Sequence, residues 1–102
     1  MMELTENLLR ETLAFLAAYG KSPADVRWVG REDEEGSWEA FAALADREYD
    51  HGFGGAEVLQ DLVVVGEDWW LEREEYDGSE WWEFKRKPTK PGGGPLTDLF
   101  CK

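Results

Sequence analysis

Cysteine and histidine are almost absent from this chain, which contains one of each, Cys101 and His51. A single cysteine cannot form an internal disulfide, and structural zinc needs several Cys and His ligands. With one histidine and no G-x-S-x-G motif, catalysis by a nucleophilic triad is not expected. We therefore expect no bound metal, no cofactor and no enzymatic activity, and the lack of disulfides favours a cytoplasmic location.

Long apolar runs are also missing. No stretch of 18 apolar residues occurs, and charged residues interrupt the first twenty positions, so neither a membrane span nor a signal peptide is expected. The 102 residues include 42% hydrophobic residues and six tryptophans. This composition supports a modest core in one domain, which we expect to span residues 1–87.

Basic residues are few, with 11 Lys and Arg against 23 Asp and Glu, for a net charge of −12. Residues 1–84 hold 22 of the acids and six of the bases, whereas residues 85–102 hold five bases and one acid. Such a body repels nucleic acid and anionic membranes, and its field speeds encounter with a basic partner. The charge predicts a basic protein partner, with solubility alone as the competing explanation.

Hydrophobic periodicity predicts two helices in the first half of the chain. The first is expected from Thr5 to Tyr19, with Thr5 as its N-cap, Glu11 on its solvent side and Gly20 just beyond its end. Ser37 is expected to cap the second helix, which the apolar spacing extends to residue 49. Between the helices, VRWVG (26–30) is typical of a short strand and REDEEG (31–36) of a charged loop.

The second half predicts a three-stranded antiparallel meander that begins with the apolar run at residues 62–66. Residues 69–76 and 79–86 form the next two strands, and Asp77-Gly78 suits a two-residue type I′ turn. The expected fold class is α+β, with two helices packed on one face of a small twisted antiparallel sheet.

Two glycine-rich segments interrupt these elements. GFGG (52–55) lacks the residues of a phosphate-binding loop and predicts a tight structural turn. PTKPGGGP (88–95) cannot continue a sheet, so residues 88–102 are expected to form a flexible tail. The apolar residues near its end are free to dock on the body or on a partner.

The Asp77-Gly78 turn fixes which residues of the hairpin face each other, because side chains alternate along a strand. The side with Trp69, Leu71 and Trp82 has more apolar neighbours and is expected to pack on the helices. The opposite side pairs Glu74 with Trp81 and Glu72 with Glu83. Its exposed residues form the candidate partner-binding site: Trp70, Glu72, Glu74, Tyr76, Trp81 and Glu83.

Carboxylates beside indoles suit an arginine-rich partner, because guanidinium groups pair with carboxylates and stack on aromatic rings. Glutamates two apart on a strand lie roughly 6.6 Å apart, close to two nucleotide steps along B-DNA, so the face can imitate DNA. The opposed Glu72 and Glu83 repel each other, and a partner cation would relieve this repulsion. Indoles also stack on sugars, so a small carbohydrate-binding module stays open, as does a solvated face covered by the tail.

Residues 38–84 combine YD-x-GFG, an apolar strand and EYDGSEWWEF. This stretch resembles a family of small acidic phage and prophage proteins, and EYDGSEWW is the more specific part of the match. The resemblance implies a phage setting, in which small acidic proteins inhibit host defence, anti-CRISPR proteins among them. Together with the acidic, aromatic face, this setting predicts a monomeric or dimeric inhibitor in the bacterial cytoplasm that binds a basic host protein or nucleoprotein, such as a CRISPR–Cas effector, and blocks its DNA access. A phage structural or assembly protein is the alternative in the same setting.

Overall fold

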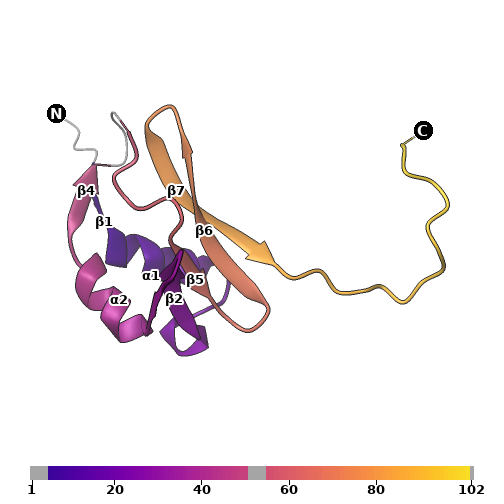
Figure 1. The fold of residues 1–102 in the computed structure, drawn as a ribbon, viewed down its shortest axis with the longest axis horizontal. Helices are drawn as coiled ribbons and strands as arrows, with labels where there is room; N and C mark the ends of the chain where they lie inside the picture. The colour runs from indigo at the N-terminus through magenta and orange to yellow at the C-terminus, as the bar shows by residue number, and fades with distance from the viewer. Residues whose placement is uncertain (1–4, 51–54, 102) are drawn as a thin grey trace.

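The computed structural model describes residues 5–50 and 55–101, which form an α+β fold and confirm the expected fold class (Figure 1). Residues 52–54 of the turn expected at GFGG (52–55) lie outside the described residues, and only Gly55 is described. In chain order the elements are β1 (Thr5–Asn7), α1 (Leu8–Ala18), the 3-10 turn η1 (Pro23–Asp25), β2 (Trp28–Arg31), β3 (Glu34–Gly36), α2 (Trp38–Ala45), β4 (Glu48–Asp50), β5 (Val63–Val65), β6 (Trp69–Tyr76) and β7 (Ser79–Arg86).

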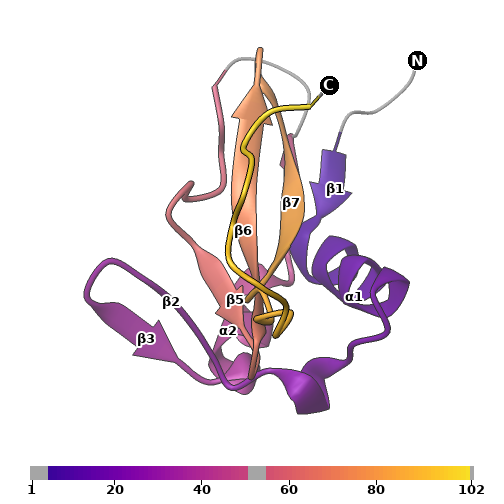
Figure 2. The same cartoon turned by 90° about the vertical axis from the view of Figure 1, so that its right-hand side faces the viewer.

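The main sheet is antiparallel and has the strand order β3-β2-β5-β6-β7. The predicted meander is confirmed as β5-β6-β7, and both turn residues Asp77 and Gly78 have the positive φ of a type I′ turn. Both helices lie on one side of this sheet, to the left in Figure 1. Figure 2 shows the sheet from the other side, which no helix of the described chain covers.

The expectation of a charged loop at residues 31–36 was wrong in part, because Glu34–Gly36 forms β3 and pairs with β2. Arg31 explains why acids are tolerated in this hairpin. Its guanidinium lies 3.0 Å from Asp61, 3.4 Å from Glu34 and 3.6 Å from Glu32. Opposite charges therefore offset the local repulsion that favoured a loop in the sequence.

Both helices are shorter than the apolar spacing predicts. Thr5 is not the N-cap of α1: Asn7 is, and its side chain accepts a hydrogen bond from the Arg10 N–H at 3.0 Å. Residues 5–7 instead pair with residues 48–50 as the short β1-β4 sheet, so α2 ends at Ala45. The cap of α2 by Ser37 and the left-handed Gly20 after α1 agree with expectation.

The core lies between the helices and the inner side of the main sheet. Trp82 is its largest fully buried side chain, and its indole N–H donates to Thr12 Oγ1 at 2.9 Å. The buried apolar set is Leu16, Val29, Phe41, Ala45, Val64, Trp69, Leu71 and Trp82. In each of the two Trp-Trp pairs, one indole therefore faces the core as expected, and these inward residues are Trp69 and Trp82.

Residues 88–101 extend away from the sheet, and the chain measures 54 Å along its longest axis (Figures 1 and 2). The radius of gyration is 16.7 Å, against about 13 Å for a compact domain of this length. The extended tail accounts for this excess. Its apolar residues Leu96, Leu99 and Phe100 are all exposed.

Candidate partner-binding face

The register of the β6-β7 hairpin is the one expected from its turn. Tyr76 pairs with Ser79, Glu74 with Trp81, Glu72 with Glu83 and Trp70 with Lys85. These residues alternate with the buried inner row and lie on the side of the sheet away from the helices. The structure thus brings together the six candidate residues Trp70, Glu72, Glu74, Tyr76, Trp81 and Glu83.

Strands β2 and β5 enlarge this surface with apolar side chains. Trp28 pairs with Val65, which pairs with Trp70, and Val63 pairs with Glu72. We call the helix-free surface made by these residues and the six candidates the open face. Sequence reasoning missed Trp28, because its place beside Trp70 depends on β5 lying between β2 and β6, an order that local patterns do not determine.

Gly30 lets the Trp28 indole lie against the sheet. A Cβ at position 30 would lie only 3.0 Å from Cζ3 of Trp28 and 2.4 Å from the Glu34 carbonyl oxygen. The missing side chain therefore makes room both for the ring and for the β2-β3 turn. As a result, Trp28 presents an exposed aromatic surface at one end of the open face.

The carboxylates of the open face are not equivalent. Glu72 accepts a hydrogen bond from the Trp70 indole N–H at 3.1 Å and lies 3.7 Å from Lys85 Nζ. Lys85 therefore reduces the expected repulsion between Glu72 and Glu83 within the chain itself. Glu74 and Glu83 make no side-chain hydrogen bond or ion pair to any other described residue. These two carboxylates are the ones available to a partner.

The inner side of the same hairpin holds a buried ionic cluster around Arg73. The guanidinium donates to Glu80 at 2.9 Å, to the Tyr49 hydroxyl at 3.1 Å and to Glu11 at 3.3 Å. It also lies 4.8 Å from the centre of the Trp82 ring. Glu80 in turn accepts the backbone N–H groups of residues 57 and 58. The cluster ties α1, β4, β6, β7 and the segment before β5 together.

Burial raises the pKa of Tyr49 well above its usual value, and the hydrogen bond that its hydroxyl donates to Glu11 adds to this. Burial alone lowers the pKa of Arg73, but its contacts with Tyr49, Glu11 and Glu80 outweigh burial and raise it. Placing Glu11 on the solvent side of its helix was therefore wrong. The available signal was Arg73 itself, because an arginine on the core side of a strand needs a buried acid.

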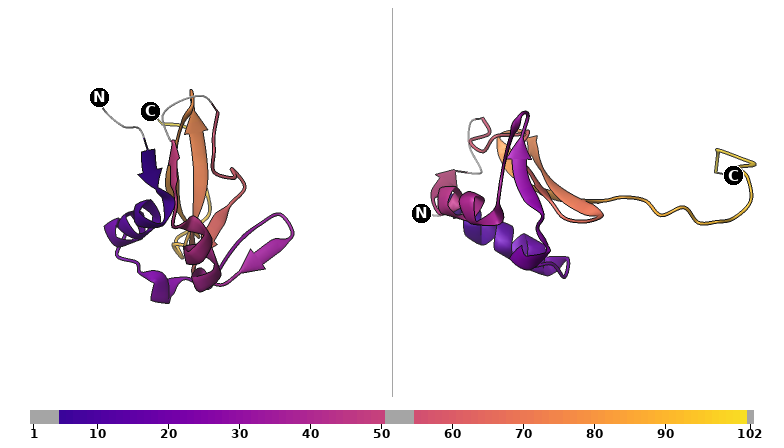
Figure 3. Two further views of the ribbon diagram at one scale, coloured as in Figure 1. Left: turned by 90° about the vertical axis from the view of Figure 1, so that its left-hand side faces the viewer. Right: turned by 60° about the horizontal axis from the view of Figure 1, so that its bottom comes forward.

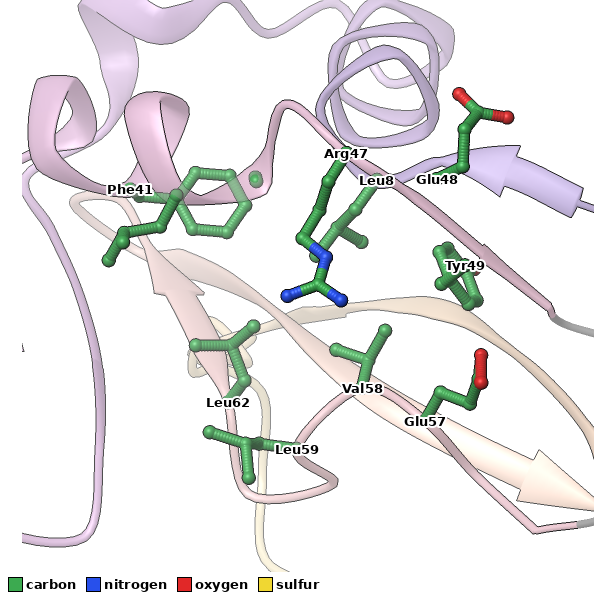
Figure 4. A pocket seen from close by; sticks show the side chains of 11 residues that line it. Leu8, Phe41, Arg47, Glu48, Tyr49, Glu57, Val58, Leu59 and Leu62 are labelled. Carbon is green, nitrogen blue, oxygen red and sulfur yellow. The ribbon is translucent and has the colours of Figure 1, made fainter.

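A groove on the helix side was not expected from the sequence. It has a volume of about 500 Å³ and lies between α2, β4 and residues 57–62 (Figure 4). A hollow of about 270 Å³ between α2 and the β2-β3 hairpin continues it, and Phe41, Leu44, Leu59 and Leu62 line both. Arg47 is the single basic residue among the described residues that line the larger part.

Two features are absent from the described parts of the chain. No three His, Cys, Asp or Glu side chains are gathered there so as to hold a metal ion. Neither helix described is long and apolar enough to cross a bilayer.

Comparison with models of known protein families, with curated proteins and with solved structures gave no match. The resemblance of residues 38–84 to acidic phage proteins therefore stays a prediction that rests on their motifs.

Proposed function

We propose that this chain is a non-enzymatic, phage-type inhibitor whose open face binds a basic, arginine-rich site on a nucleic-acid-binding host protein. The observation that carries the proposal is the open face itself, where three indoles lie among glutamates on a side of the sheet that no described helix covers. The inhibitor excludes nucleic acid by occupying the residues that would bind phosphates. A CRISPR–Cas effector is the target that the motif resemblance implies.

The local chemistry of Trp81 and Glu74 supports an arginine partner. The two residues lie directly opposite each other on β7 and β6, and Trp81 is 38% exposed. A guanidinium that stacks on this indole can reach the Glu74 carboxylate at the same time. Stacking and charge pairing favour arginine over lysine at such a site, because only the planar guanidinium does both well.

Electrostatics support the same partner over longer distances. Residues 1–84 carry a net charge of −16, from 22 acids and six bases. This field attracts a basic cleft and repels DNA, so association should be fast at low salt and slower at high salt. Nucleic acid and the inhibitor then compete for one surface, and direct binding of this chain to nucleic acid is not part of the mechanism.

Affinity capture with the immobilised full chain, from a bacterial lysate that contains a CRISPR–Cas system, tests the proposal. We expect a basic effector to be retained, and DNA binding by the purified effector to fall as the inhibitor is added. Trp81→Ala with Glu74→Lys should weaken this competition by about 30-fold, the effect of losing about 2 kcal/mol at an aromatic hot spot.

Trp81→Ala with Glu39→Lys is the matched control for the charge change, because Glu39 is exposed on α2 and away from the open face. Both double variants have the same net charge. If Glu74 contacts the partner, the variant with Glu74→Lys should therefore bind more weakly than the variant with Glu39→Lys. If both variants compete as well as the parent, the open face is not the binding site.

The exposed indoles also favour a second candidate, a small carbohydrate-binding module. Trp28 and Trp81 are both exposed at the open face, and indoles stack on sugar rings. An oligosaccharide array separates the two functions. Retention of one glycan class, lost in Trp81→Ala, supports the module, whereas an array without binding leaves the protein partner as the explanation.

A further inference from the structure

We propose that the apolar groove between α2 and residues 57–62 binds the C-terminal segment Leu96–Phe100 of a second copy of this chain, so that two chains exchange their tails. The groove lies on the helix side, away from the open face. The inference therefore stands independently of the proposed inhibitor function.

The groove has an apolar surface that the chain leaves uncovered. At its mouth Leu44 is 78% exposed and Leu59 is 52% exposed. Phe41 and Leu62 extend the same surface into the neighbouring hollow. Contiguous apolar surface of this kind, on a chain with 33% charged residues, marks a place where another segment packs.

The tail offers matching side chains. Leu96 is 85% exposed, Leu99 76% and Phe100 83%, so three large apolar residues within five positions lack any cover. The glycines before them leave the segment free to adopt the conformation that a groove selects. Outside the open face, the groove and the tail therefore carry the most exposed large apolar side chains of the described chain, above Leu13 at 39% and Tyr19 at 49%.

Charge adds specificity to this match. The Arg47 side chain lies among the apolar residues of the groove in Figure 4 and forms no ion pair with any other described residue. Asp98 is the one acid of residues 85–102 and lies between Leu96 and Leu99 in the sequence. An Arg47–Asp98 pair beside buried apolar anchors gives this guanidinium an ion-pair partner, which the described residues of its own chain do not supply.

The direction of the tail favours a second copy as its source. The groove is lined by α2, β4 and residues 57–62. Both α2 and β4 lie on one side of the sheet, and the tail leaves on the opposite side (Figure 1). Seen from the helix side, α2 lies in front and the tail extends behind the sheet (Figure 3, left), and the right-hand view shows it projecting far from the body. Docking in the same chain would require the tail to pass around the sheet edge.

Exchange between two copies is reciprocal, so the dimer has two equal tail-groove contacts related by a twofold axis. Once one tail is bound, the second binds at a high effective concentration, which strengthens two individually weak contacts. This dimer keeps both open faces exposed, since each tail is held on the helix side of the partner.

Sedimentation velocity of the full chain, from about 1 μM to about 1 mM, tests self-association across the weak range of affinities. We expect a concentration-dependent dimer. Arg47→Asp or Asp98→Arg alone should each weaken it by about tenfold or more, and the two charge reversals together should restore most of the affinity. Arg10→Asp makes the same charge change at an exposed position of α1 and should have little effect.

Cys101, the single cysteine, allows the tail to be located directly. A nitroxide on Cys101 of one chain is mixed with isotope-labelled Cys101→Ser chains, and NMR line broadening is read on the labelled copy. Broadening at Leu44, Leu59 and Leu62 supports exchange. The proposal is overturned by a monomer at every concentration, by dimers indifferent to the charge reversals, or by a labelled copy that shows no broadening at the groove or shows it only at the open face.

Discussion

The guanidinium of Arg73 donates to the carboxylate of Glu80 at 2.9 Å across the β6-β7 pair, and both side chains are 0% exposed. Burying an ion pair removes water from both charged groups, which costs free energy. Further hydrogen bonds to the two side chains offset part of this cost. Here Tyr49 and Glu11 accept further hydrogen bonds from the terminal nitrogens of Arg73, and two backbone N–H groups donate to Glu80. Only the buried Nε of Arg73 has no hydrogen-bond partner among the described residues. The pair therefore acts as a crosslink between the hairpin and the rest of the fold.

Removal of one member should be strongly destabilising. Glu80→Ala leaves Arg73 as a buried cation with a weakened set of partners, so we expect the free energy of unfolding to fall by about 3–5 kcal/mol. Urea denaturation followed by tryptophan fluorescence measures this change. Glu67→Ala is the control, because the Arg27–Glu67 pair is exposed and such pairs contribute at most about 1 kcal/mol. Equal, small effects of the two substitutions would mean that the cluster is not a crosslink.

Tyr49 gives the fold a specific sensitivity to alkaline pH. Its pKa in the folded chain is raised above the unfolded value of about 10. Above that pH the unfolded chain loses the phenol proton while the folded chain keeps it, so the free energy of unfolding decreases as pH rises. Below about pH 9 the stabilising contribution is complete.

Tyr49→Phe tests this linkage. The variant should be less stable than the parent at neutral pH, because the hydrogen bonds to Glu11 and Arg73 are lost. Between about pH 9 and about pH 11 its stability should fall less steeply than that of the parent. Parallel stability curves for the two proteins over this range would show that Tyr49 does not carry the alkaline effect.

The hairpin was predictable from sequence to the residue, because Asp77-Gly78 fixes the turn and the alternation of side chains then fixes every pair. The ends of the helices were not. Residues 5–7 and 48–50 have helix-compatible patterns, but they pair with each other across more than forty positions, and local periodicity contains no information on such pairing. For the same reason, the sequence did not predict that Trp28 belongs to the candidate site, because its position beside Trp70 depends on long-range strand pairing.

Gly66 is required for the packing of Trp69. A Cβ at position 66 would lie 2.1 Å from Cε2 and 2.2 Å from Nε1 of the buried indole. Gly66→Ala should therefore displace the ring and lower the free energy of unfolding by about 1–3 kcal/mol, as overpacking of a core does. Gly94→Ala is the control, since a Cβ there meets no atom within 4 Å. Thermal melts of both variants that match the parent would show that the turn at Gly66 adjusts freely.

The two adjacent tryptophans Trp81 and Trp82 should separate stability from binding. Trp82 is buried and donates to Thr12, so Trp82→Ala should lower the free energy of unfolding by about 3–5 kcal/mol. Trp81 belongs to the open face, so Trp81→Ala should change stability by less than about 1 kcal/mol.

Binding to the captured effector is the second readout for this pair. Trp81→Ala should weaken it by about 2 kcal/mol or more while the chain stays folded, because an exposed indole that anchors an arginine acts only in the complex. Trp28→Ala, at the other end of the same face, should weaken binding without unfolding as well, since Trp28 continues the row that contains Trp70. If both exposed tryptophans are dispensable for binding while Trp82→Ala unfolds the chain, the indoles of the open face have no part in partner recognition and the contact must lie elsewhere on the molecule.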